Sequence, residues 1–80
     1  KDVWAMSTVM QTIGEINNAH IDSPPSILVP LYRNIPLTGC PDDFAKAFEE
    51  YVAACESGDR DAFINAHYKI KAVYDAHCSN

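Results

Sequence analysis

Residues 40–63, CPDDFAKAFEEYVAACESGDRDAF, predict two amphipathic helices joined by a short turn. The apolar side chains of the first half share one helical face: Phe44, Phe48, Tyr51, Val52 and Cys55. Pro41 suits the first position of a helix, and the two carboxylates that follow it favour the positive end of the helix dipole. Gly58 is expected to end this helix and Asp59 to cap the next one. The stretch therefore predicts an antiparallel helical hairpin.

The same spacing extends the prediction on both sides of this stretch. The hairpin helices are expected at about residues 41–57 and 60–77, and a further helix at about residues 3–20. The inward positions of the C-terminal helix are Phe63, Ala66, His67, Ile70, Val73, Tyr74 and His77. Those of the N-terminal helix are Val3, Met6, Met10, Ile13 and Ile16. Gly14 is expected to allow close contact with another helix. The direction of the N-terminal helix relative to the hairpin stays open.

A proline-rich apolar crossover, residues 22–40, links the N-terminal helix to the hairpin. All five prolines of the chain lie between residues 24 and 41, which excludes a long helix or an inner strand there. Pro30 could open one helical turn, from Leu31 to Asn34. We expect the crossover to pack on the bundle and to bury Leu28, Leu31, Ile35 and Leu37, within one chain or a symmetric dimer. The alternative is an exposed ligand for a partner's groove, or an arm exchanged between subunits.

These elements predict an all-α fold in one helical domain, residues 1–80, with three main helices and the crossover packed on them. A core of this size is marginal, so a covalent link would matter. Cys40 and Cys78 lie at similar sequence distances on either side of Gly58, which brings both to the open end of the hairpin. We expect them to form a disulfide and leave Cys55 unpaired. The bridge would place the protein in an oxidising compartment, periplasmic or extracellular. Three reduced thiols in a cytosolic protein are the alternative.

Charge is concentrated in the first hairpin helix. The chain has a net charge of −5, which disfavours nucleic acid and anionic membranes as partners. No apolar run approaches the ~18 residues that membrane insertion requires. The exposed side of helix 41–57 forms a candidate contact face for a basic protein partner: Asp42, Lys46, Glu49, Glu50 and Glu56. Carboxylates along an exposed face are more often ordinary solvated surface.

Residue patterns for chemistry are weak in this chain. His67, His77 and Cys78 lack the close ligand spacing of metal sites, so no metal or cofactor is predicted. Both histidines are expected as hydrogen-bonded residues at the edge of the core. Cys55 and His67 could form a nucleophile pair, but no oxyanion donor is evident near either, and no catalytic residue is assigned.

The sequence therefore favours a non-enzymatic binding module of the periplasm or extracellular space, inhibitor-like or immunity-like, that faces a basic partner. A homodimer is an open alternative. The alternative function is a small enzyme or ligand-binding domain with a pocket near His67 and Cys55. The chain starts at Lys1 and shows no signal peptide, which fits a processed product or a fragment of a longer chain.

Overall fold

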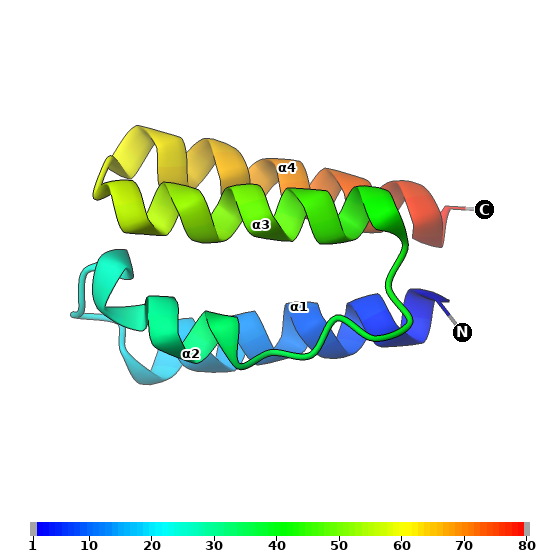
Figure 1. Cartoon of the computed structure of the whole chain (residues 1–80), viewed down its shortest axis with the longest axis horizontal. Coiled ribbons are helices and arrows are strands. Elements are labelled where there is room, and N and C mark those ends of the chain that lie inside the picture. Colours follow the sequence, from blue (N-terminus) through cyan, green and yellow to red (C-terminus); the bar gives the residue numbers. More distant parts are fainter. Residues whose placement is uncertain (1, 80) are drawn as a thin grey trace.

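The computed structural model describes residues 2–79, which form an all-α fold (Figure 1). Its elements are α1 (Asp2–Ala19), the 3-10 helix η1 (Pro25–Leu28), α2 (Val29–Arg33), α3 (Asp42–Ser57) and α4 (Arg60–Cys78). The predicted architecture, three main helices with the crossover packed on them, is confirmed. Each main helix begins and ends within one residue of its expected bounds.

The α3–α4 hairpin forms as its turn residues predict. Gly58 takes the left-handed conformation, φ 73°, and its N–H donates to the Cys55 carbonyl at 3.4 Å. A side chain strains this conformation, which is why glycine suits the helix end. The Asp59 carboxylate then accepts from the backbone N–H groups of Asp61 and Ala62, at 2.9 and 3.3 Å, and caps α4. The helix-ending and helix-starting roles of these two residues are therefore local and independent of the rest of the bundle.

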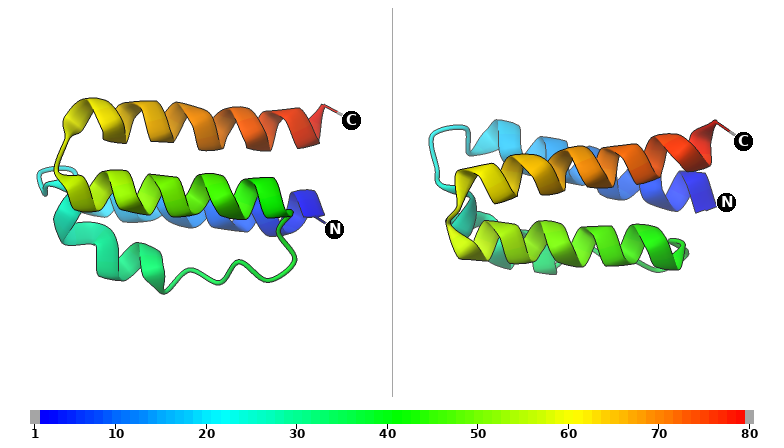
Figure 2. Two further views of the ribbon diagram at one scale, coloured as in Figure 1. Left: turned by 45° about the horizontal axis from the view of Figure 1, so that its top comes forward. Right: turned by 90° about the horizontal axis from the view of Figure 1, so that it is seen from above.

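The direction of α1 relative to the hairpin, which the sequence left open, is fixed by the structure. The N- and C-termini lie at the same end of the bundle, so α1 runs parallel to α3 and antiparallel to α4 (Figures 1 and 2). The hydroxyls of Ser7 and Tyr74 share a hydrogen bond between α1 and α4. Gly14 has no atom of another element within 4 Å of where a Cβ would lie, so the predicted close contact there is wrong. The main packing contacts of α1 come instead from its apolar face.

The crossover returns along the bundle from the end of α1 to the start of α3 (Figures 1 and 2). The helical turn predicted at Pro30 is α2. Leu28 and Ile35 are buried, with exposed fractions of 4% and 8%, and Leu37 is partly buried. Leu31 is not buried within its own chain, because its side chain is 39% exposed, and its burial in a symmetric dimer stays a prediction. Leu28, Val29 and Tyr32 form the buried side of this segment, and Leu31 lies on its exposed side.

One continuous core joins all these elements. It includes the two tyrosines Tyr32 and Tyr51, which are completely buried. The buried set is Met6, Val9, Ile13, Leu28, Val29, Tyr32, Ile35, Phe44, Ala47, Phe48, Tyr51, Val52, Cys55 and Ile70. Because the crossover contributes Leu28, Val29, Tyr32 and Ile35 to this set, it is part of the core of its own chain.

Candidate functional site

The predicted Cys40–Cys78 disulfide is wrong, because all three cysteines are free thiols. Cys40 packs against the core, and the loop before it approaches α1: a Cβ on Gly39 would lie 3.4 Å from the Cβ of Ala5. Cys78 is exposed on α4. Similar sequence distances from Gly58 therefore did not suffice to pair the two thiols. The prediction of a periplasmic or extracellular location was conditional on this bridge and is overturned with it.

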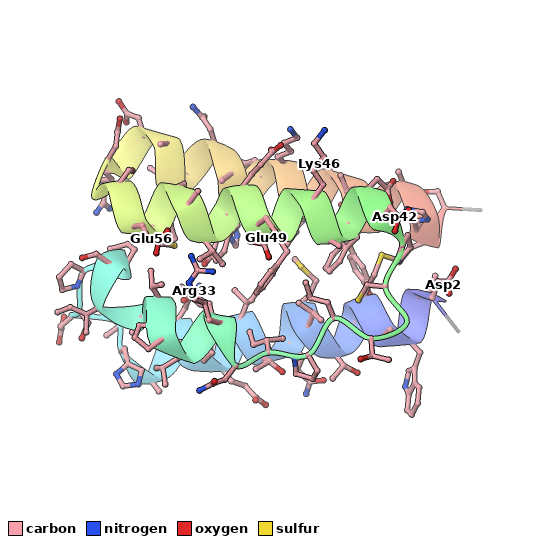
Figure 3. All side chains as sticks on the ribbon, in the orientation of Figure 1. Asp2, Arg33, Asp42, Lys46, Glu49 and Glu56 are labelled. Carbon is pink, nitrogen blue, oxygen red and sulfur yellow. The ribbon has the colours of Figure 1, made fainter. Side chains whose placement is uncertain are left out.

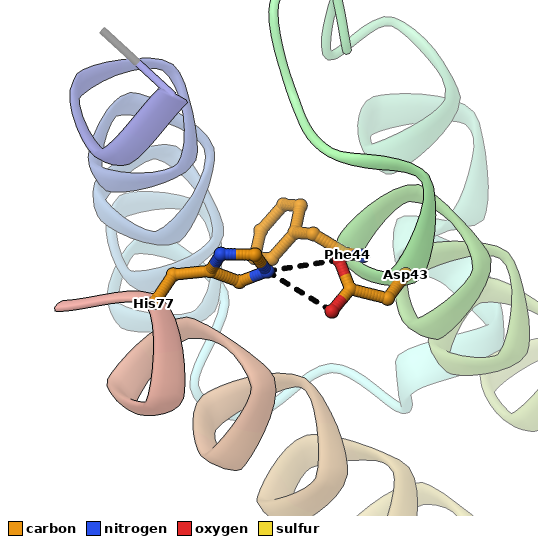
Figure 4. Close-up of polar contacts among 3 residues, drawn as sticks. All are labelled: Asp43, Phe44 and His77. Carbon is orange, nitrogen blue, oxygen red and sulfur yellow. Dashed lines mark hydrogen bonds and ion pairs between the residues drawn. The ribbon is translucent and has the colours of Figure 1, made fainter. Parts of the chain in front are cut away.

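A histidine–carboxylate pair joins the open end of the hairpin where the disulfide was expected (Figure 4). His77 Nε2 lies 2.9 and 3.0 Å from the two carboxylate oxygens of Asp43. The same carboxylate accepts from the backbone N–H of Phe44 at 2.8 Å. The hydrogen bond from His77 is the main cause that lowers the pKa of the Asp43 carboxyl. His77 is therefore a hydrogen-bonded histidine, as expected, whereas the same expectation for His67 is wrong, since the His67 ring forms no hydrogen bond within residues 2–79.

Cys55 and His67 are not assembled as a nucleophile pair. Cys55 is fully buried, and burial raises the pKa of its thiol to about 11, so the thiol is protonated at neutral pH. Catalytic cysteines instead need an accessible site that favours the thiolate. The His67 ring packs near Tyr51 and Tyr68, each with its ring centroid 6.2 Å away. The two residues line different cavities. The single pocket expected near both of them is not present as one site.

The residues of the predicted acidic face lie along α3 as expected, but neighbouring elements neutralise part of it. Figure 3 shows Glu49 and Glu56 toward the crossover and Lys46 toward α4. Glu56 forms an ion pair with Arg33 at 3.0 Å, and Glu50 one with Lys69 at 2.6 Å. The hydrogen bond from Lys69 is the main cause that lowers the pKa of Glu50.

Asp42 and Glu49 are the carboxylates of this face that form no ion pair among residues 2–79. They are seven residues apart, about two helical turns, and both are exposed. The acidic face is therefore narrower than the sequence predicted. Its open part is the stripe from Asp42 to Glu49.

A buried polar cluster that the sequence analysis missed lies between α1, α2 and α3. The hydroxyl of Tyr32 donates to Asn17 Oδ1, that of Tyr51 donates to Tyr32 Oη at 3.2 Å, and Asn17 Nδ2 donates to Tyr51 Oη at 3.4 Å. The tyrosine rings meet edge to face, with centroids 5.1 Å apart. Burial raises the pKa of both tyrosines, so both stay protonated as donors. The position of Asn17 in the sequence could have indicated this cluster, because Asn17 follows Ile13 by four residues and so continues the inward face of α1.

Beside this tyrosine network (Asn17, Tyr32 and Tyr51) the surface is hollowed. Two cavities of about 310 and 220 Å³ share Asn17 and Phe63. The larger one is also lined by Ile64, His67 and Tyr68. The smaller one is also lined by His20, Ile21, Ser23, Pro25 and Leu28. Together they form a depression between the C-terminal end of α1 and the first half of α4, the α1–α4 groove.

Comparisons with protein-family models, curated proteins and solved structures gave no match. In residues 2–79, no helix has the length and apolar character to span a membrane. Over the same residues, no three side chains of His, Cys, Asp or Glu gather into a possible metal site.

Proposed function

We propose that this chain is a non-enzymatic binding module that uses the acidic face of α3 to contact a basic protein partner. The observation that carries the proposal is the exposed stripe from Asp42 to Glu49, whose carboxylates form no ion pair within residues 2–79. Complementary charge across an interface mainly steers association and selects partners. This stripe is therefore the expected centre of contact.

The electrostatics of α3 favour binding over acid–base chemistry. A general acid requires a desolvated carboxyl group whose pKa is raised toward neutrality. The pKa values of Asp43 and Glu50 are lowered, and each carboxylate has a cationic or hydrogen-bonding partner. Both groups therefore carry a fixed negative charge at neutral pH. Such charges attract a cationic surface without taking part in proton transfer.

The borders of the acidic face can also take part in binding. Arg33 and Lys69 hold Glu56 and Glu50 in ion pairs whose side chains are about half exposed. Exposed pairs of this kind contribute little to stability, so exchange for a partner's cation costs little. A basic partner can therefore contact Asp42 and Glu49 first and recruit the two border carboxylates afterwards.

The test compares two charge reversals on different helices. A partner is first isolated from the native host with the parent chain, and its association rate is then measured by stopped flow for parent, Glu49→Lys and Glu15→Lys. Glu15 is exposed on α1 and has no ion pair within residues 2–79, so it makes a matched control. Glu49→Lys should slow association at low salt, and the difference should shrink at high salt as charges are screened. The proposal fails if both variants associate at the same rate.

One observation favours a second function. The α1–α4 groove places His67 beside a cavity of about 310 Å³, which supports ligand binding at this histidine but not at Cys55. Self-association of the chain stays a prediction.

A further inference from the structure

We propose that the α1–α4 groove binds a small uncharged molecule that carries a flat aromatic ring and a hydrogen-bond acceptor. The groove lies between α1 and α4, whereas the acidic face lies along α3 and uses none of the groove residues. This second binding site is therefore independent of the proposed partner contact. Its ligand class follows from the rings, the unused donor, the charge and the size of the groove.

Aromatic side chains form the α4 side of the groove. Phe63 and His67 are one helical turn apart, and Tyr68 follows directly. The Tyr51 ring lies behind them, with centroid distances of 5.5 Å to Phe63 and 6.2 Å to His67. Aromatic rings favour offset or edge-to-face contacts at such separations. A planar ligand ring therefore finds several aromatic partners in one place.

The tyrosine network holds this wall in position before a ligand arrives. Tyr51 is fully buried, and its hydroxyl is bonded to both Tyr32 and Asn17. Phe63 and His67 pack against this fixed ring. A preformed site loses less conformational freedom on binding than a mobile one. The groove is therefore prepared for a ring of fixed orientation.

Asn17 supplies a polar contact at the point where the two cavities meet. Its carbonyl oxygen accepts from Tyr32, and one N–H of its amide donates to Tyr51. The second N–H has no partner among residues 2–79, and Asn17 lines both cavities. A ligand carbonyl or ring nitrogen can accept this hydrogen bond. Sites for small molecules commonly combine apolar walls with a few such polar groups.

Charge and size narrow the ligand class further. None of the side chains that line these two cavities is Asp, Glu, Lys or Arg. A charged ligand would find no carboxylate, ammonium or guanidinium partner in this lining, which is unfavourable. The larger cavity, about 310 Å³, is near the lower end of the ~300–1,000 Å³ typical of ligand sites. The ligand is therefore expected to be a molecule of one or two fused rings.

The experiment uses prodan, an uncharged naphthalene ketone whose fluorescence reports the polarity around it. Binding should shift its emission to the blue and should move the NMR signals of the Asn17 side-chain amide, Phe63 and His67. Tyr68→Ala should weaken binding by about 2- to 12-fold, the range expected for one aromatic contact. Tyr68→Phe keeps the ring and should bind like the parent.

Trp4→Ala is the matched control for loss of an exposed aromatic ring. Trp4 and Tyr68 are 79% and 66% exposed, so neither truncation removes core packing, and Trp4 lines neither cavity. This variant should bind prodan like the parent. Glu49→Lys should also leave prodan binding unchanged, which separates this test from that of the acidic face.

The inference is overturned by any of four results. Prodan fails to bind, it binds without moving the Asn17 and His67 signals, or Tyr68→Ala binds like the parent. The fourth result is movement of the same signals with protein concentration in the absence of prodan, because a second copy of the chain would then occupy the groove.

Discussion

Leu28→Ala and Leu31→Ala form a matched pair that tests how the crossover packs. Leu28 ends η1 and Leu31 lies in the adjoining α2, and their exposed fractions are 4% and 39%. Truncation of a leucine to alanine removes three carbon atoms, and each buried one contributes ~0.8 kcal/mol. Full burial therefore makes the transfer cost of Leu28→Ala about 2.4 kcal/mol.

A cavity adds to this cost at Leu28, where the surrounding core includes Val29, Tyr32 and Tyr51. Because a cavity in a packed core collapses only in part, the total for Leu28→Ala should reach about 3–4 kcal/mol. The Leu31 side chain is only roughly three-fifths buried, and solvent can fill the space that its truncation leaves. Its truncation should therefore cost about 1–1.5 kcal/mol.

The assay is urea unfolding at constant pH and temperature, followed by far-UV circular dichroism for the parent and both variants. The m-values should agree, so that midpoint shifts report stability differences. Leu28→Ala should unfold at the lower urea concentration. A Leu31→Ala cost equal to or greater than that of Leu28→Ala would refute the packing described for the crossover.

Two further predictions concern the thiols and the open end of the hairpin. Intact mass should be the same with and without reductant, and a reductant-dependent mass would contradict the free thiols. A thiol reagent should modify exposed Cys78 in the native protein but should reach buried Cys55 only after unfolding. The lowered pKa of Asp43 means that its ionised form stabilises the fold above the unfolded-state pKa of about 3.9, and this contribution is lost as pH falls through the lower folded-state pKa. Asp43→Asn should therefore reduce the loss of thermal stability that the parent shows as the pH falls into the acid range. Asp61→Asn is the control, because Asp61 is exposed in the first turn of α4. The same acid dependence in the parent and in Asp43→Asn would exclude a stabilising role for the Asp43 carboxylate.

The sequence predicted what short-range chemistry determines. Gly58 and Asp59 end one helix and begin the next because a left-handed residue and a capping carboxylate act within one turn. Pro30 marks α2 because its fixed φ suits a helix start. The apolar positions of α3 predicted its buried face correctly, because helical periodicity places them on one side of the helix whatever that side packs against.

Side-chain direction in the crossover was harder to predict. The apolar content of the segment indicated that it packs on the bundle, and Leu28 and Ile35 do so. Composition does not determine which side of a single turn faces inward. Composition therefore pointed to Leu31 as a buried residue and did not identify Tyr32, which the structure buries completely.

Only the tertiary structure decided the relations across elements. Cys40 and Cys78 do not form a disulfide, and the open end of the hairpin is joined instead by His77 and Asp43. The tyrosine network depends on α1 lying beside α2 and α3, and the α1–α4 groove on α1 lying beside α4. The long crossover leaves this placement of α1 open. Periodicity along one helix determines which face is buried, whereas the packing of whole helices determines which residue of another element meets it.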